Sequence, residues 1–410
     1  MKLSIVICVY NTDYRLFENC LKSIRASTLD GGDYEIVVID DGSSVDYSEL
    51  RERYSLRYIK TENRGIFRAR LLGASLALGE YTAFVDSDDT VSFNFHRSML
   101  DEAERSDADI VIGGWAFHAD RGRHWCKRDS TLSEKIDKKG AEVLSAFLER
   151  EGREHSYFVL WNKLFRSELL KSACMSAEAA AGGTERFNYS EDALICFYAF
   201  SAAARLVNVR GGFYFYRIHS AQTVNVISEQ RLRSQICCMG KTFDAMLLGV
   251  ADNPDADALE AHILAWRALM ARSHYSHASA NKYVELYDYI KEVYKTDKLS
   301  LSKFKDGAVY ASNKLLPKNF DEIEEELVFL WNTSVPTQIS PRGADAYTKT
   351  ALEYIAEHNE NVTLTERGRR LPKPKTKLKD RIIMNSFVYT VGMLLFKKGS
   401  KIRAFLKRHL

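Results

Sequence analysis

Residues 83–89 read Ala83-Phe84-Val85-Asp86-Ser87-Asp88-Asp89, an apolar strand that runs directly into three carboxylates. Like charges a few ångströms apart repel one another, so folding alone does not favour this cluster at the end of a buried strand. A hard cation such as Mg²⁺ or Mn²⁺ relieves the repulsion, because it binds carboxylates, water and substrate phosphates together. We therefore predict a metal–diphosphate site here, with a solvated Asp-rich turn as the alternative.

The first hundred residues alternate short apolar runs with amphipathic helical patterns. Such alternation is typical of a parallel sheet with helices on its faces. Polar residues follow the predicted strands, whose carboxyl ends gather at one sheet edge and form a nucleotide-sized crevice. The predicted strands are 3–10, 34–39, 57–59 and 81–85, the helices are 14–27 and 66–78, and the polar loops are Asn11-Thr12-Asp13, Asp40-Asp41-Gly42-Ser43 and Asp86-Ser87-Asp88-Asp89.

Beyond residue 93 the pattern becomes less regular. Ser190 is the expected N-cap of an apolar helix that ends near residue 203, and Glu191 and Asp192 in its first turn suit the helix dipole. We also expect a helix at 93–105, strands at 109–112 and 213–217, a mobile loop at 177–184 and mostly helix at 228–294. The predicted domains are a catalytic domain at 1–227, a helical domain at 228–345 and a basic amphipathic tail at 346–410.

Charge is unevenly distributed along the 410 residues. Residues 366–410 hold fourteen Lys or Arg against two acids, a net charge of +12, and because the whole chain carries +3, residues 1–365 carry −9. A basic segment of this kind is attracted to an anionic surface. Aromatic residues are not interleaved with the basic ones as base stacking requires, so we expect a membrane and no nucleic acid.

Residues 382–396 form an uncharged run inside this basic tail. The run is shorter than the ~20 apolar residues that a membrane-spanning helix needs. We expect an in-plane or re-entrant helix on the inner face of the cell membrane, and a tail helix that packs on the body is the alternative.

The seven cysteines are scattered and none forms a Cys-x-x-Cys pair. Neither a disulfide framework nor a zinc site is indicated, so we expect reduced thiols and a cytoplasmic protein. The N-terminal apolar run, residues 3–10, is short and no small-residue cleavage signal follows it, so we expect no signal peptide.

Six short motifs occur in the order and at the spacing of a known family. Together they resemble the family 2 inverting glycosyltransferases, bacterial surface-glycan type, over about residues 1–225. The resemblance implies a GT-A fold, an α/β Rossmann-like nucleotide-binding sheet with flanking helices, followed here by a mostly helical C-terminal region. Leu71 replaces the usual Asn, and Phe67 stands where small or polar residues are common. The motifs are Val9-Tyr10-Asn11, Ile39-Asp40-Asp41-Gly42-Ser43, Asn63-Arg64-Gly65-Ile66-Phe67-Arg68-Ala69-Arg70, Asp86-Ser87-Asp88-Asp89, Ser190-Glu191-Asp192 and Tyr216-Arg217-Ile218-His219.

The resemblance implies a nucleotide-binding role for one group of residues. Tyr10 has a ring available to stack on the base, and Asp41 accepts a hydrogen bond from it, which favours uracil and hence a UDP-sugar. Arg70 approaches the diphosphate. The full group is Val9, Tyr10, Asn11, Asp40, Asp41, Arg70, Asp86 and Ser87, and Trp161 and Lys163 line the sugar or acceptor side.

The resemblance also implies metal ligands and a general base. Asp88 and Asp86 bind Mn²⁺ or Mg²⁺, with His219 as a further metal or diphosphate ligand. Asp192 is the general base and Glu191 supports it. Each has a structural alternative: the acid pair caps a helix, His219 is a hydrogen-bonded structural residue, Trp161 is core packing and Asp40 closes a turn.

Sugar transfer needs a cation to neutralise the leaving diphosphate, a base for the attacking hydroxyl, and substrates held in line. One base opposite the leaving group gives inversion. We therefore predict a metal-dependent inverting glycosyltransferase that moves a sugar from a nucleotide donor to a glycan or lipid-linked acceptor. A non-catalytic membrane-associated protein and a sugar nucleotidyltransferase are the alternatives, although the latter is expected to carry a Gly-rich loop after the first strand. The oligomeric state is not fixed, and the helical region offers one surface for a homo-oligomer.

Overall fold

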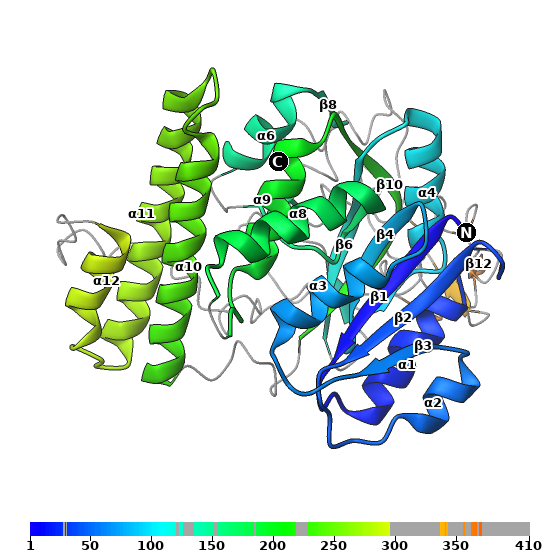
Figure 1. Ribbon diagram of the computed structural model, residues 1–410. Helices are drawn as coiled ribbons and strands as arrows, with labels where there is room; N and C mark the ends of the chain where they lie inside the picture. Colours follow the sequence, from blue (N-terminus) through cyan, green and yellow to red (C-terminus); the bar gives the residue numbers. More distant parts are fainter. Residues whose placement is uncertain are drawn as a thin grey trace. The chain divides into compact units, whose positions relative to one another are not determined.

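The computed structural model describes residues 1–27, 29, 31–119, 123–125, 135–150, 154–183, 186–218, 228–295, 337–340, 342, 352, 356, 362–366 and 369–370. Its main sheet confirms the α/β fold expected from the sequence (Figure 1). Over the described residues the strand order is β3-β2-β1-β4-β9-β6-β10-β5, with β7 paired to β6 and β8 paired to β10. These strands are β1 Leu3–Val9, β2 Tyr34–Asp40, β3 Arg57–Lys60, β4 Tyr81–Asp86, β5 Thr90–Val91, β6 Ile110–Ala119, β7 Arg123–Trp125, β8 Asp137–Lys139, β9 Lys163–Arg166 and β10 Arg205–Ile218.

Strands β1, β2, β3 and β4 are parallel, and their register brings their carboxyl ends to one edge. Val9 of β1 is opposite Asp40 of β2, and Cys8 is opposite Asp86 of β4. Strand β9 then pairs antiparallel with both β4 and β6. The polar loops after β1, β2 and β4 therefore meet as predicted.

Helix α1 (Tyr14–Arg25) begins where the sequence predicts. Of the apolar face expected from the helical period, it buries Phe17, Cys20, Leu21 and Ile24, whereas Leu16 is half-buried. Asp13 is its N-cap, because the Asp13 side chain accepts hydrogen bonds from the backbone amides of Arg15 and Leu16 at 2.9 and 3.2 Å. The cap fixes the chain direction directly after the β1 loop.

Helix α3 (Ile66–Leu76) packs over β1 and β2 in front of the sheet in Figure 1. A Cβ on Gly73 would lie 2.3 Å from Cγ1 of Val6, so only glycine permits this close approach. Further helices accompany the sheet: α2 Ser48–Arg53, α4 Phe95–Ser106, α6 Ala141–Leu148, α7 His155–Phe158, α8 Ser167–Ala180 and α9 Glu191–Ala202. Helix α8 corrects the loop expected at 177–184, since it continues through 177–180, where alanine favours helix.

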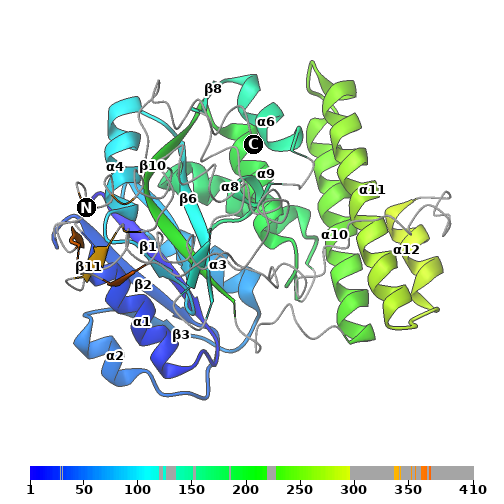
Figure 2. The ribbon, with the colours of Figure 1, turned by 180° about the vertical axis from the view of Figure 1, so that it is seen from behind.

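Three helices follow in the predicted helical region: α10 Glu229–Val250, α11 Ala256–Ala280 and α12 Leu286–Tyr294. They pack on one another (Figures 1 and 2) and belong to the same compact unit as most of the sheet. A Cβ on Gly240 of α10 would lie 2.3 Å from Cγ1 of Val293, so α10 and α12 approach closely at this point. None of the helices in the described ranges is both long and apolar enough to cross a bilayer.

A second unit consists of Trp115–Glu134, Phe215–Ser220 and Leu316–Leu410. Within it, β7 pairs antiparallel with the end of β6, and β11 (Thr337–Ser340) lies between the parallel strands β12 (Val362–Leu364) and β13 (Arg369–Arg370). Strands β12 and β13 fall inside the range predicted as the basic tail. His219 and the uncharged run 382–396 lie outside the described residues.

Candidate active site

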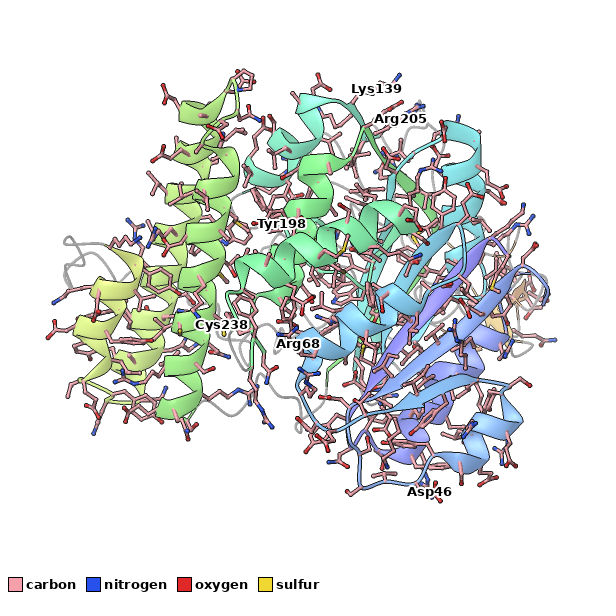
Figure 3. All side chains as sticks on the ribbon, in the orientation of Figure 1. Asp46, Arg68, Lys139, Tyr198, Arg205 and Cys238 are labelled. Atoms are coloured by element: carbon pink, nitrogen blue, oxygen red, sulfur yellow. The ribbon has the colours of Figure 1, made fainter. Side chains whose placement is uncertain are left out.

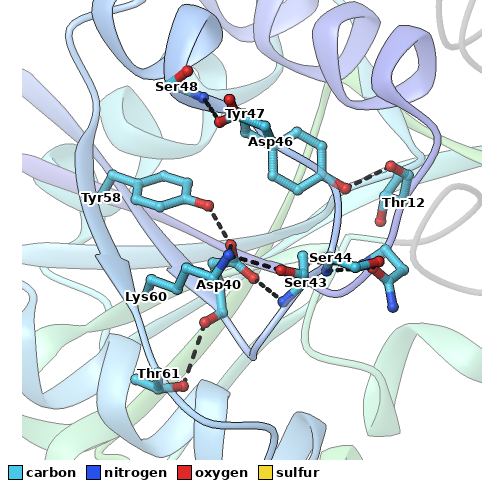
Figure 4. Close-up of polar contacts among 11 residues, drawn as sticks. Thr12, Asp40, Ser43, Ser44, Asp46, Tyr47, Ser48, Tyr58, Lys60 and Thr61 are labelled. Atoms are coloured by element: carbon cyan, nitrogen blue, oxygen red, sulfur yellow. Dashed lines mark hydrogen bonds and ion pairs between the residues drawn. The ribbon is translucent and has the colours of Figure 1, made fainter.

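The loop after β1 is fastened to the loop after β2 by a set of short hydrogen bonds (Figure 4). Asn11, which has a left-handed backbone (φ 50°), accepts hydrogen bonds from the backbone amide and hydroxyl of Ser44 at 2.8 and 2.9 Å. The backbone amide of Asn11 in turn donates to Ser43 Oγ at 2.9 Å. Asn11 thus orders the edge of the crevice, and the neighbouring Tyr10 side chain is 53% exposed and accessible to a ligand.

Asp40 is a fully buried carboxylate that closes the turn after β2. It accepts hydrogen bonds from the Ser43 amide at 2.7 Å and from the Tyr58 hydroxyl, and Lys60 Nζ lies 3.7 Å away (Figure 4). Burial and this hydrogen bond to Asp40 raise the pKa of Tyr58. Every contact of Asp40 is internal, which matches the structural alternative for this residue. Val9 is similarly buried in the core.

Asp41 connects the β2 loop to the start of α3. Its two carboxylate oxygens accept hydrogen bonds from the backbone amides of Arg64 and Gly65, both at 2.8 Å. Gly65 has φ +91°, a conformation that only glycine adopts readily. The three residues fix the entry of α3 beside the predicted base pocket.

Arg70 of α3 is the centre of an ion cluster at this sheet edge. Its guanidinium donates to Asp86 Oδ1 at 3.1 Å and to Glu191 Oε1 at 2.7 Å, and it contacts Asp192 Oδ1. Arg70 is only 5% exposed. Burial works against its charge, but Asp86 and Glu191 more than offset this, so the pKa of Arg70 is raised. Through Arg70, the structure brings Asp86 of the strand-end motif close to Glu191 and Asp192, the predicted general base and its neighbour.

Asp86 has a raised pKa. Burial is the main cause, Arg70 acts against it, and the nearby Asp88 carboxylate raises it further. A carboxylate whose charge is disfavoured by a neighbouring carboxylate suits a divalent cation. Among the described residues no group of three or more His, Cys, Asp or Glu side chains is arranged to hold a metal ion.

The third carboxylate of the motif is structural. Asp89 is 1% exposed and accepts a hydrogen bond from the Tyr214 hydroxyl at 2.6 Å, while the Asp86 amide donates to the same hydroxyl at 3.0 Å. Burial raises the pKa of Tyr214, so it remains a donor at neutral pH. Through these two hydrogen bonds Tyr214 stabilises the loop that carries Asp86 and Asp88. Ser87 is held separately, by a 2.7 Å contact with Thr12 Oγ1.

Trp161 and Lys163 lie in the protein interior. Trp161 is 4% exposed and stacks on Tyr214 with ring centroids 4.5 Å apart. Lys163 is fully buried, and its ammonium donates to the Val159 carbonyl and to Asn162 Oδ1. The burial of Trp161 matches the core-packing alternative, and Lys163 is likewise held by internal contacts.

The pair Glu191-Asp192 forms the first turn of α9. Asp192 Oδ2 accepts a 3.4 Å hydrogen bond from the Leu160 amide, and Glu191 is 8% exposed. Ser190 occupies the N-cap position, but its side chain does not cap α9, which corrects the sequence prediction. Its left-handed backbone (φ 61°) turns Ser190 Oγ toward Thr242 of α10 instead, at 2.7 Å.

A cavity of about 570 Å³ lies between α3 and α8, next to Asp41. Arg64 and Arg68 stand on its polar side, and Leu72 and Met175 on its apolar side. Figure 3 labels Arg68 at the start of α3. Arg68 pairs with Glu178 and Lys171 with Glu168, so the rim charges are largely neutralised.

Two residues of the site, Tyr214 and Thr242, had no role predicted from the sequence. Both act through contacts with residues more than 50 positions away, and neither belongs to a polar motif. No local signal identifies such residues.

Comparison with known proteins gives one family match and several relatives. Residues 4–171 match the family described as glycosyl transferase family 2. EpsH of Bacillus subtilis (strain 168), which carries the name glycosyltransferase, is 29% identical over 229 residues, or 54% of this chain and 62% of EpsH. Poly(ribitol-phosphate) beta-glucosyltransferase of Bacillus spizizenii is 34% identical over 120 residues, 28% of this chain and 19% of that protein.

A similar solved structure is S. aureus TarS 1–349 in complex with UDP-GlcNAc, with TM-score 0.44, 17% identity, and coverage of 72% of this chain and 92% of that one. The chain spans about 60% of the length of its relatives EpsH and EpsJ of B. subtilis.

Proposed function

We propose that the chain transfers a sugar from a nucleotide donor to a hydroxyl acceptor with inversion, because residues 4–171 match the family described as glycosyl transferase family 2. The observation that carries the proposal is the Arg70 cluster. It places Asp86, at the end of β4, in contact through one guanidinium with Glu191 and Asp192, at the start of α9. Leaving-group chemistry and proton removal need this proximity.

The proposed donor is a UDP-sugar. Tyr10 offers an exposed ring for stacking. Asp41 lines the cavity next to α3, and its two oxygens, which accept the Arg64 and Gly65 amides, each have a further lone pair for a base. A carboxylate accepts from the imide N–H of uracil, which has no counterpart in cytosine. Both proposed contacts are with the base, so UDP should bind without the sugar.

Asp86 and Asp88 would hold Mn²⁺ or Mg²⁺. The Asp88 carboxylate raises the pKa of Asp86, and a cation would relieve this repulsion. Hard oxygen donors suit such an ion, and donor phosphates and water would be its further ligands. When bound, the ion would neutralise the leaving diphosphate. Arg70, deeply buried against the same carboxylate, would keep Asp86 ionised and oriented.

Asp192 is the proposed general base. It takes the proton of the acceptor hydroxyl as that oxygen attacks the anomeric carbon. The bond from this carbon to the diphosphate oxygen breaks, and the nucleoside diphosphate leaves with the electron pair. A single displacement inverts the anomeric configuration. Glu191 shares Arg70 with Asp192 and so restrains the base.

The proposed acceptor is a glycan or a lipid-linked glycan of a bacterial surface polymer. The naming of relatives such as poly(ribitol-phosphate) beta-glucosyltransferase supports this class. The net +12 of residues 366–410 supports attraction to the anionic inner face of the cell membrane. Co-sedimentation with anionic vesicles, with a chain ending at Arg367 as comparison, tests this attachment; a full-length chain that stays in the supernatant contradicts it.

Donor use is tested with a panel of nucleotide sugars in the presence of Mn²⁺, with released nucleotide as the readout. We expect turnover of at least one UDP-sugar and its loss on chelation. Calorimetry with UDP and Mn²⁺ separates the remaining outcomes. Binding without turnover would indicate a missing acceptor, whereas no UDP binding would reject the proposed function.

A further inference from the structure

We propose that helix α10 is part of the catalytic machinery, because Thr242 positions the loop that carries the base. The inference rests on the proposed role of Asp192. Thr242 lies in the helical region, 50 residues beyond Asp192 in the sequence, where no nucleotide-binding or catalytic motif was found. It is a positioning residue, since its contact is with Ser190 and not with a reacting group.

Ser190 adopts a conformation that needs external support. Its φ of 61° is left-handed, which is unfavourable for a residue with a Cβ unless surrounding contacts compensate. Ser190 Oγ lies 2.5 Å from the Tyr189 carbonyl within its own loop and 2.7 Å from Thr242 Oγ1. Thr242 is thus its contact from outside the loop, and the Thr242 hydroxyl also lies 3.1 Å from the Cys238 carbonyl. Thr242 is fully buried, so water cannot replace this partner. The contact therefore contributes directly to the turn that starts α9.

The two residues before Ser190 also contact the C-terminal helices. The Asn188 backbone lies beside the Cys238 thiol of α10, which Figure 3 labels. The ring centroids of Tyr189 and His274 of α11 are 6.0 Å apart. His274 Nδ1 is within 2.6 Å of the Tyr294 hydroxyl on α12. All three helices of the region thus contribute to one support.

The opposite side of the loop touches the nucleotide-binding half of the site. Phe187 packs on Phe67 with ring centroids 5.4 Å apart. Asn188 lies so close to Gly65 that a Cβ there would come within 2.2 Å of its Oδ1. The loop, residues 187–190, is therefore held between the start of α3 and helix α10. Asp192 lies two residues after Ser190, the last residue of this loop. Loss of the Thr242 contact should let the base drift from Arg70 while the nucleotide pocket stays intact.

The test compares full-length Thr242→Val with Thr242→Ser. Valine keeps the shape and removes the hydroxyl, whereas serine restores it. We expect kcat for the UDP-sugar substrate to fall about tenfold in the valine variant, an amount equal to about 1.4 kcal/mol in the barrier. KM for the donor and the Kd for UDP should stay within twofold, and serine should recover most of kcat.

Thr82→Val is the matched control. Thr82 is another fully buried threonine, and its Oγ1 lies 2.7 Å from Ser167 Oγ, a hydroxyl pair of the same length that does not touch the site. Both valine variants should lose similar thermal stability, but only Thr242→Val should lose kcat. Equal kcat losses in the two variants, or a loss that serine does not recover, would reject the positioning role.

Hydrogen exchange separates this inference from the proposed function. Thr242→Val should speed amide exchange across residues 187–192, and Thr82→Val should not. If the wild-type protein turns over no nucleotide sugar but this exchange difference is present, the support by α10 holds and the transferase assignment fails. If exchange at 187–192 is unchanged, the support itself is refuted, whatever the activity.

Discussion

The guanidinium of Arg70 donates a 2.7 Å hydrogen bond to Glu191, which lies 121 positions further along the chain. The same side chain reaches Asp86 at 3.1 Å. One buried cation thus joins the end of β4 to the start of α9. Because Asp86 and Asp192 are the proposed metal ligand and general base, the proposed reaction geometry would depend on this single residue.

Replacement of Arg70 by Lys should abolish measurable transfer. A lysine keeps the charge but lacks the planar fork that satisfies several carboxylates at once. Disruption of a buried ion pair typically costs about 3–5 kcal/mol, so a fall in unfolding free energy of that order is expected as well. Urea unfolding and donor turnover check the two effects, and Arg51→Lys, an exposed position on α2, is the control. Normal turnover by R70K would contradict the cluster's role.

Asp192→Asn should reduce kcat by at least a hundredfold, because an amide does not accept the hydroxyl proton. UDP affinity should change only a few-fold, since the nucleotide pocket lies on other loops. Kinetics with a saturating donor, alongside calorimetry with UDP, measures both. The exposed Asp101→Asn serves as the control, and an Asp192→Asn enzyme with wild-type kcat would show that another group is the base.

The two aspartates at the end of the motif should respond differently to substitution. Asp88→Asn should weaken Mn²⁺-dependent turnover strongly, because it removes a proposed ligand. Asp89→Asn retains an acceptor for the Tyr214 hydroxyl and should stay active. Tyr214→Phe removes the hydroxyl that donates to the buried Asp89, at a cost of about 1–3 kcal/mol. Metal titrations and thermal melts distinguish these results, and equal metal dependence of the two Asn variants would count against the assignment.

Gly65→Ala should destabilise the protein by about 1–3 kcal/mol and weaken UDP binding. The backbone at φ +91° is strained with any side chain, and the new Cβ meets Asn188. Gly32→Ala is the matched control, since no atom lies within 4 Å of its Cβ position, and it should stay within about 0.5 kcal/mol of wild type. Chemical denaturation is the measurement, and indistinguishable stabilities would contradict the close packing.

Stability should fall on acidification because of His96. Burial lowers the pKa of His96 to about 3, and neither ring nitrogen has a hydrogen-bond partner. The unfolded chain takes up a proton below about pH 6.5, whereas the folded protein does not, so the loss begins there and grows toward pH 3. This residue alone should account for roughly 2 kcal/mol between pH 7.5 and 5.0. Urea unfolding of His96→Leu at both pH values should show a loss smaller by that amount; an unchanged pH dependence would contradict the prediction.

The sequence predicts those parts of the fold that local patterns determine. Strands β1, β2 and β4 are short continuous apolar runs, as is typical of buried parallel strands, and the buried face of α1 repeats at the helix period. Both patterns can be recognised without knowledge of their partners. Helix α8 was missed because its polar and small residues give no strong periodicity, although alanine favours helix.

For the candidate site, too, the residues within motifs could be predicted from the sequence, whereas their long-range partners could not. The clustering of Asp86 with Asp192 follows from motifs, but the separation of Asp88 from Asp89 depends on Tyr214, which is 125 positions from Asp89. Phe67 departs from the family pattern, and its partner Phe187 lies far along the chain. Such pairings arise only when the chain has folded, so no window of sequence contains them.

Strand β9 (Lys163–Arg166) sits between β4 and β6, although both of those strands precede it in the chain. The ribosome must therefore synthesise the chain through residue 166 before β4 can pair with β9. Until then a growing polypeptide exposes the free backbone of an apolar strand, a template for unwanted pairing between nascent chains. Fragments that stop near residue 150 should consequently aggregate, and expression of shortened versions should begin to yield well-behaved material only when β9 is included.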